Sequence, residues 1–319
     1  MWKKIAAAVG CGVLLWSGSP AMAAEQDAAW LYKEACLANV NDDRIASTNV
    51  DLFGPNYHWE LNADGKILRD GSMRWYGNMS WDFTETSNNV TSHEDIPFYL
   101  EQKDGILSMY AQREHKWGKI SLPGLPPEVV NAWKTGSLSF IDDSMQAVKN
   151  VSLTSDTDKM QGLRIVMDAG KMMQVSEKYL GEGSAHLSAK EKQEQKELIA
   201  NLAKALQGTD VTVDWVISKA DRKTVTISTD FTPLLRAYAR NVINEMAAGK
   251  VKLSNDEREM MESLGYFSEL KFYMTYKNTN QDENLVIPAD VRKSAIELIN
   301  LADIQKGVSE ASQTGKKKG

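Results

Sequence analysis

The most constraining feature of the sequence is a run of twelve residues, Met73 to Thr84, with an unbroken period of two. One side of the pattern reads Met73, Trp75, Gly77, Met79, Trp81 and Phe83, and the other reads Arg74, Tyr76, Asn78, Ser80, Asp82 and Thr84. This is the period of a β-strand, whose successive side chains point to opposite faces of a sheet. At about 3.3 Å per residue the strand is about 40 Å long, well above the usual length. Such a strand predicts a strongly curved sheet or barrel with one face wrapped around something.

Neighbouring segments repeat this alternation, and short polar segments separate them. Tyr57, Trp59 and Leu61 alternate before an expected turn at residues 62–65. Residues 97–102 and 106–111 flank Lys103-Asp104-Gly105, which indicates a hairpin. Further strands are expected at 115–122, 163–168, 211–217, 225–229, 269–277 and 285–287. Tight turns between consecutive strands predict an antiparallel meander.

Helices are expected between and after these strands. Apolar spacing and capping residues place them at 27–38, 126–134, 170–180, from 188 onward, at 233–248, from 254 onward and at 288–301. The predicted fold is α+β: a curved antiparallel sheet of about eight to eleven strands, forming an unclosed half-barrel with helices packed on its concave face. No linker rich in Pro, Gly or Ser divides the chain, so residues 24–303 are expected to form a single domain, followed by a disordered basic tail at 304–319.

The first 23 residues have the pattern of a secretory signal peptide. Lys3 and Lys4 precede an apolar stretch at 5–16, and Ala21-Met22-Ala23 supplies small residues for cleavage. The apolar stretch is short for a hydrocarbon core of about 30 Å, so cleavage is expected rather than anchoring. The apolar run continues past Cys11, which predicts no lipid anchor there. Cys36 is then the remaining thiol, expected to be buried. These features predict export to a bacterial periplasm or cell envelope.

Motifs of catalysis and cofactor binding are missing from the sequence. The four histidines fall in no zinc-binding spacing, and no nucleotide-binding loop or nucleophile elbow is present. His93-Glu94-Asp95 is a dense group of metal-capable residues, interpreted as part of a solvated loop. The formal charge of −6 predicts no basic face for nucleic acid. We therefore expect no enzyme, no cofactor, no metal site and no nucleic-acid partner.

Methionine and aromatic side chains on the inward faces of the strands suggest an apolar ligand. Of 14 methionines, Met1 and Met22 leave with the signal peptide, and several others lie on strands. Methionine adapts to irregular apolar partners, although the same residues could simply fill a core. The predicted ligand-binding residues are Trp75, Met79, Trp81, Phe83, Met109, Trp215, Leu270, Phe272 and Met274.

The order of these segments resembles a known superfamily. A signal peptide, a first amphipathic helix, the strand Met73–Phe83, the pair Phe98–Tyr110 leading to His115-Lys116-Trp117, and Leu285-Val286-Ile287-Pro288 before a closing helix follow one another. This order resembles the LolA/LolB and LppX/LprG superfamily of bacterial envelope lipid and lipoprotein carriers. The resemblance implies an unclosed half-barrel with helices plugging its mouth and an apolar cavity for acyl chains.

We therefore expect an envelope protein that binds acyl chains or lipidated ligands between sheet and helices without covalent chemistry. Its expected partners are a lipid or a lipidated protein, with transient contact to a membrane surface as a further option. The alternative is a structural or partner-binding envelope module with the same fold and a filled core. A hydrolase with a site of no recognised motif is a third alternative.

Overall fold

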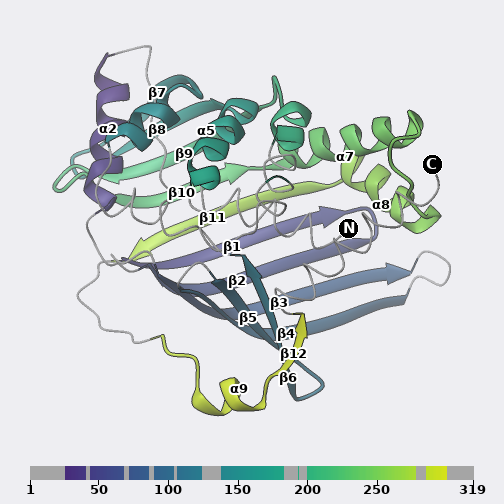
Figure 1. Ribbon diagram of the computed structural model, residues 1–319. Helices are drawn as coiled ribbons and strands as arrows, with labels where there is room; N and C mark the ends of the chain where they lie inside the picture. The colour runs from purple at the N-terminus through teal and green to yellow at the C-terminus, as the bar shows by residue number, and fades with distance from the viewer. Residues whose placement is uncertain are drawn as a thin grey trace.

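The computed structural model describes residues 26–40, 44–67, 72–85, 90–103, 106–123, 138–182, 193, 200–277 and 285–299. The strands in these ranges form one continuous sheet (Figure 1). They are β1 (Arg44–Gly54), β2 (Tyr57–Ile67), β3 (Met73–Glu85), β4 (Val90–Lys103), β5 (Ile106–Arg113), β6 (Lys116–Pro123), β7 (Val148–Asp156), β8 (Met160–Asp168), β9 (Asp210–Ser218), β10 (Thr224–Asp230), β11 (Glu269–Lys277) and β12 (Ile296–Ile299).

The sheet consists of two antiparallel meanders joined side by side. Its strand order is β12-β6-β5-β4-β3-β2-β1-β11-β10-β9-β8-β7, so β1 pairs with β11 where the two meanders meet. All neighbours run antiparallel except β12, which lies parallel to β6. The edges, β12 and β7, do not pair with each other, so the sheet is unclosed. The predicted α+β class with an unclosed, mainly antiparallel sheet is confirmed, and the described part contains 12 strands, above the expected range.

The register gives the sheet two chemically distinct faces. The face that carries Val50, Leu61, Met79 and Phe272 is called the apolar face here; these residues are neighbours across β1, β2, β3 and β11. The opposite face, called the polar face, carries the intervening row Asp51, Glu60, Ser80 and Lys271. The alternation predicted from β3 therefore extends across the sheet.

The described part also contains helices, several of which lie over one half of the apolar face. They are α2 (Gln26–Val40), α4 (Leu138–Met145), α5 (Ala169–Glu182), α7 (Thr232–Ala247), α8 (Asn255–Tyr266) and α9 (Ala289–Ser294), and Gln193 and residues 200–205 are also helical. Helices α2, α5 and α7 lie over the β7–β11 half (Figure 1). None of the helices within the described ranges has the length and apolar character needed to cross a lipid bilayer.

Local sequence signals account for where two of these helices begin. Pro233 occupies the first turn of α7, where its missing N–H is not needed by the helix. At α8 the backbone N–H of Glu257 donates to Ser254 Oγ at 3.3 Å, and the Ser254 N–H donates to Glu257 Oε2 at 2.9 Å. This reciprocal pair is the capping box expected from the sequence.

The hydrophobic core lies between these helices and the strands beneath them. Trp215 is 2% exposed, and its indole N–H donates to Thr224 Oγ1 at 2.7 Å. Tyr32 of α2 packs edge-on against the same indole with ring centroids 4.9 Å apart. Phe231, next to α7, packs on Phe272 of β11, with ring centroids 6.0 Å apart. Each large apolar side chain buried in this way contributes about 1.5–3 kcal/mol.

Two glycines on the apolar face of β2 and β3 occupy positions with no room for a side chain. A Cβ added at Gly65 would overlap the indole of Trp75, its neighbour on β3. A Cβ added at Gly77 would overlap the backbone carbonyl oxygen of Asn62. Residues 62–65, predicted as a turn, therefore lie inside β2, because glycine there makes room for an aromatic ring on the adjacent strand.

The last described segment differs from its prediction, and its helix packs on the polar face. Residues 285–287 form no strand, and the expected helix at 288–301 is replaced by the short helix α9 and the parallel strand β12 (Figure 1). Ile287 and Val291 pack on Tyr110, with Tyr99 and Trp117 beside them. These aromatic rings form an apolar surface against which α9 packs, on the face opposite α2, α5 and α7. Helices are therefore not confined to the predicted side.

Ion pairs between one glutamate and two arginines also connect α9 to the sheet, next to this apolar surface. Glu101 of β4 is 9% exposed and accepts hydrogen bonds from Arg74 Nε at 3.1 Å and from Arg292 Nη2 at 2.8 Å. The Arg292 guanidinium also lies over the Tyr110 ring, 5.9 Å from its centroid. The two guanidinium groups compensate the negative charge of the buried carboxylate and also supply its hydrogen bonds.

Several predictions fall outside the described residues. They are the signal peptide at 1–23, the helix at 126–134, the start of the helix at 188 and the tail at 304–319. They stay predictions.

Candidate functional site

The register places the predicted ligand-binding residues on the apolar face. Trp75 lies opposite Leu100, which lies opposite Met109 on β5. The second meander contributes Trp215, Leu270, Phe272 and Met274 to the same face. Phe83 is opposite Tyr57 in the register, and its side chain is not among those that the structure describes.

These residues divide into two groups by burial. Trp75, Trp215, Leu270, Phe272 and Met274 are buried, with exposed fractions of 2–8%. Met79, Trp81 and Met109, on β3 and β5, remain partly exposed. Four of the buried residues belong to the helix-covered second meander, whereas Trp75 lies on β3. All five are part of the core cluster, and Met79 packs against its edge.

The partly exposed group belongs to a larger apolar patch that sequence reasoning recognised only in part. It spans β2 to β6 and comprises Trp59, Leu61, Met79, Trp81, Ile96, Leu100, Met109 and Ile120, all of them partly exposed. We call this set the open patch. Cross-strand pairs form continuous rows, such as Leu61–Met79–Ile96 and Leu100–Met109–Ile120. Five strands spaced about 4.8 Å apart make the patch roughly 20 Å wide.

Tyr57, at the start of β2, borders the open patch beside Trp81. The rings of Tyr57 and Trp81 are stacked 6.0 Å apart with an angle of 8° between their planes. The Tyr57 hydroxyl is 2.6 Å from Ser268 Oγ, just before β11. This contact connects the patch border to the helix-covered half of the sheet.

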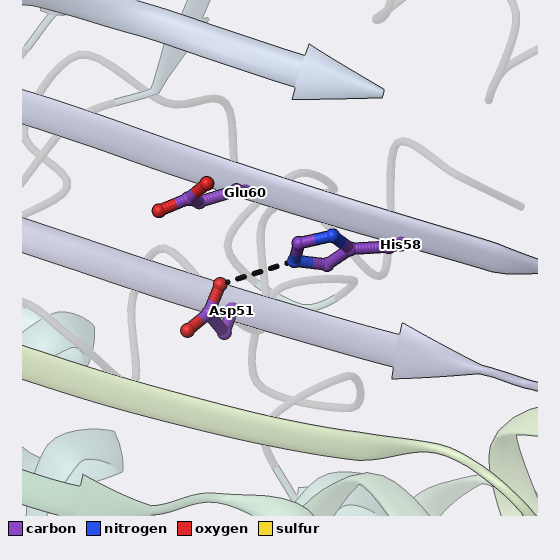
Figure 2. Close-up of side chains that lie close together, drawn as sticks. All are labelled: Asp51, His58 and Glu60. Carbon is purple, nitrogen blue, oxygen red and sulfur yellow. Dashed lines mark hydrogen bonds and ion pairs between the residues drawn. The ribbon is translucent and has the colours of Figure 1, made fainter. Parts of the chain in front are cut away.

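The polar face carries a row of carboxylates and imidazoles across β1 to β4. His58 Nε2 lies 3.3 Å from Asp51 Oδ1, and Asp82 lies between His58 and His93. His93 Nδ1 is 2.6 Å from Asp82 Oδ1 and its Nε2 is 3.1 Å from Asp95 Oδ2. Figure 2 shows the His58 ring with Asp51 and Glu60 beside it on this face.

His93, Glu94 and Asp95 were predicted in a loop but lie within β4, because their polar side chains face partners on β3 and β5.

This environment changes the ionisation of His93 and Asp95. Hydrogen bonds to Asp82 and Asp95 raise the pKa of His93 above its ordinary value of 6.5. Hydrogen bonds from Ser80, His93 and Asn78 lower the pKa of Asp95 below its ordinary value of 3.8. The row thus favours a charged imidazole between charged carboxylates.

Cys36 has the environment of a structural thiol. It is buried and free on α2, and its burial raises the pKa of the thiol well above the ordinary value. A thiol that stays protonated is a poor nucleophile. This agrees with the role expected for Cys36 from the sequence.

Comparisons with known proteins add little to this description. No family model matches the chain, and no curated protein matches it. Among solved structures, the chain is similar to LprF from Mycobacterium bovis, with 10% sequence identity and a TM-score of 0.36. The alignment covers 85% of this chain and 98% of LprF. At this level of similarity, function has to be argued from the residues of this chain.

Proposed function

We propose that this protein is an exported envelope protein that binds acyl chains, or ligands that carry them, against the open patch on β2 to β6. The observation that supports this proposal is the contrast within a single face of a single sheet. Apolar side chains over β7 to β11 are buried under helices, whereas those of the open patch remain partly exposed. A contiguous apolar surface that its own chain leaves partly accessible is typical of a binding site.

The chemistry of the open patch suits flexible apolar ligands. Met79 and Met109 have unbranched side chains that adapt to the shape of a partner, while Trp59 and Trp81 offer large flat surfaces. Burial of apolar surface yields about 25 cal/mol per Å², so covering 200 Å² is worth roughly 5 kcal/mol before the cost of ordering the ligand. Binding of this kind needs no covalent step.

The proposal places the protein beyond the inner membrane, in the periplasm or cell envelope, as the signal-peptide pattern at 1–23 predicts. A lipid or a lipidated protein would deliver the acyl chain, and transfer would involve brief contact with a membrane surface. Helix α9 packs on the opposite face, and strand β12 extends the same sheet as its edge strand beside β6.

Native mass spectrometry of gently purified protein tests this proposal, together with titration of a fluorescent fatty acyl probe. We expect a co-purified lipid-sized mass and saturable uptake of the probe. Repeated recovery of ligand-free protein that also takes up no probe would count decisively against the proposal.

A matched pair of substitutions on one strand locates the binding surface. Met109→Glu places a charge in the open patch, and Gln112→Glu places the same charge on the polar face of β5. Met109→Glu should weaken probe binding by at least tenfold, since burying an unpaired carboxylate is costly. Gln112→Glu should bind like the unmodified protein, and equal binding by both variants would place the site elsewhere.

The second candidate is a structural or partner-binding module whose interior is filled. The burial of Trp215, Leu270 and Phe272 favours this reading for the helix-covered half. Trp81→Gln and Phe272→Gln separate the two candidates. A filled interior predicts a large loss of stability in both variants, whereas the acyl-binding proposal predicts such a loss in Phe272→Gln alone and weaker probe binding in Trp81→Gln.

A further inference from the structure

The polar face holds a cluster of metal-capable side chains that acyl binding does not use. Asp51 lies on β1 directly opposite Glu60 on β2, and His58 lies two residues before Glu60 on the same face. One ligand atom from each of these residues lies within 4.8 Å of the other two. Figure 2 shows the imidazole and the two carboxylates on adjacent strands, with one ring nitrogen directed at Asp51.

The two nitrogens of the His58 ring lie near different carboxylates. Nε2 is 3.3 Å from Asp51 Oδ1, and Nδ1 is 3.8 Å from Asp82 Oδ2. A neutral imidazole carries one N–H and one lone pair, so it can donate to only one of these carboxylates. A metal ion on Nε2 would leave the ring proton on Nδ1, on the side of Asp82.

Neighbouring residues hold the ligand side chains in place. Phe53 stacks on the His58 ring with centroids 4.2 Å apart and an angle of 7° between the planes. Asn49 Nδ2 donates to Glu60 Oε1 at 2.8 Å, which leaves the other carboxylate oxygen of Glu60 available. Asp82 Oδ2 lies 3.8 Å from Nδ1, so a small side-chain rotation would bring it within hydrogen-bond distance and fix the ring tautomer.

The local charge balance favours a cation. Asp51, Glu60 and Asp82 contribute three carboxylates around His58, and His93 lies on the far side of Asp82. The nearest lysine across the sheet is Lys271 of β11, opposite Asp51, and its Nζ is 2.8 Å from Glu269. The charge of Lys271 also interacts with Asp51 and Asp230, so it is shared among several carboxylates, and the three carboxylates around His58 outnumber it.

The geometry points to a site for a divalent metal ion of the zinc class, bound by His58 Nε2 and by the carboxylates of Asp51 and Glu60, with Asp82 as a positioning residue. One imidazole nitrogen with two carboxylate oxygens suits zinc and its first-row neighbours rather than calcium, which prefers oxygen ligands alone. Two atoms that each bind zinc at about 2.1 Å are at most about 4.2 Å apart, so small side-chain rotations close the site. The site is independent of acyl binding, because it lies on the opposite face.

Isothermal titration of the full chain with zinc chloride, and in parallel with calcium chloride, tests this inference. We expect one zinc ion per chain and much weaker calcium binding. His58→Ala and Asp51→Asn should each weaken zinc binding by at least about tenfold. His115→Asn is the matched control: this exposed histidine lies in the β5–β6 turn with φ of 61°, a conformation that asparagine tolerates, and zinc binding should not change.

Three results would overturn the inference: no stoichiometric zinc binding by the unmodified chain, zinc binding by His58→Ala as tight as before, or calcium binding as tight as zinc binding. Far-UV circular dichroism checks that each variant is folded. If His58→Ala does not fold, Asp51→Asn carries the test, because it keeps the shape of the side chain and removes only the charge. Zinc-induced shifts of the His58 ring signals in NMR spectra of the unmodified chain give a second, independent readout.

Discussion

Gly65 leaves room for an aromatic ring from the adjacent strand β3. Its missing side chain leaves room for the Trp75 indole, which is 8% exposed and therefore has little freedom to move aside. Gly65→Ala should lower the free energy of unfolding by about 1–3 kcal/mol, the usual cost of an extra methyl group in a packed site. Chemical denaturation followed by tryptophan fluorescence measures this change.

Gly265→Ala provides the control for that substitution. Gly265 is buried in α8, and a Cβ there would meet its nearest neighbour at an ordinary 3.5 Å. Alanine also has the higher helix propensity, so this variant should be as stable as the unmodified protein or up to about 1 kcal/mol more stable. If Gly65→Ala kept full stability as well, the close packing of Trp75 over Gly65 would be wrong.

His93 should titrate above its ordinary pKa. Hydrogen bonds to Asp82 and Asp95 stabilise its charged form, so its pKa in the folded protein lies above 6.5. A raised pKa means that these interactions stabilise the fold fully below the pKa of the unfolded chain and that this contribution is lost as the pH rises through the folded-state pKa. NMR titration of the imidazole signals should give a midpoint above 6.5, which Asp95→Asn should lower. A midpoint at or below 6.5 would contradict the geometry of this row.

At the scale of the elements, Glu101 connects α9 to the sheet. Glu101 holds both Arg74 and Arg292, so Glu101→Gln removes the charge that joins α9 to the sheet. We expect the amides of residues 289–299 to exchange hydrogen at least tenfold faster, corresponding to a local loss of about 1–3 kcal/mol.

Glu94→Gln is the matched control for that experiment. Its ion pair with Arg113 lies at the surface, with the arginine side chain 72% exposed, and exposed pairs contribute little. Exchange in 289–299 should be unchanged in Glu94→Gln. Equal exchange rates in Glu101→Gln and the unmodified chain would mean that the apolar contacts of Ile287 and Val291 hold α9 without the ion pairs.

Sequence patterns predicted the elements whose signal is local. The alternation in β3, β9 and β11 and the Ser254–Glu257 cap correspond to observed structure because each lies within a few consecutive residues. Strands β1 and β7 were not singled out, and β12 was taken for helix. Their assignment depends on partners far along the chain, such as β11 for β1 and β6 for β12.

The candidate sites were predictable to different degrees for the same reason. The period of two was enough to place Met79 and Trp81 on a shared face. It could not separate them from the buried Trp215 and Phe272, because burial depends on where the helices pack. The cluster of Asp51, His58 and Glu60 was missed because its ligands come from two strands, whereas the sequence search looked for short spacings within one segment.

At the scale of the whole molecule, the two faces of one unclosed sheet have different chemistry. The apolar face is covered by helices over β7 to β11 and partly exposed over β2 to β6, while the polar face carries ion pairs, the Asp51–His58–Glu60 cluster and α9 (Figures 1 and 2). The two proposed ligands therefore contact different surfaces. Saturation with zinc should leave the affinity for an acyl probe unchanged within about twofold, because the sites share no side chain.

Photolabelling tests the acyl-binding proposal most directly. A fatty acid that carries a diazirine near the end of its chain is bound to the protein and irradiated, and the labelled residues are identified by peptide mass spectrometry. The account predicts saturable labelling on the open patch, in the peptides that contain Met79, Trp81 and Met109, and competition by unlabelled fatty acid. Absence of specific labelling, or labelling confined to the polar face or to the helices over β7 to β11, would contradict it.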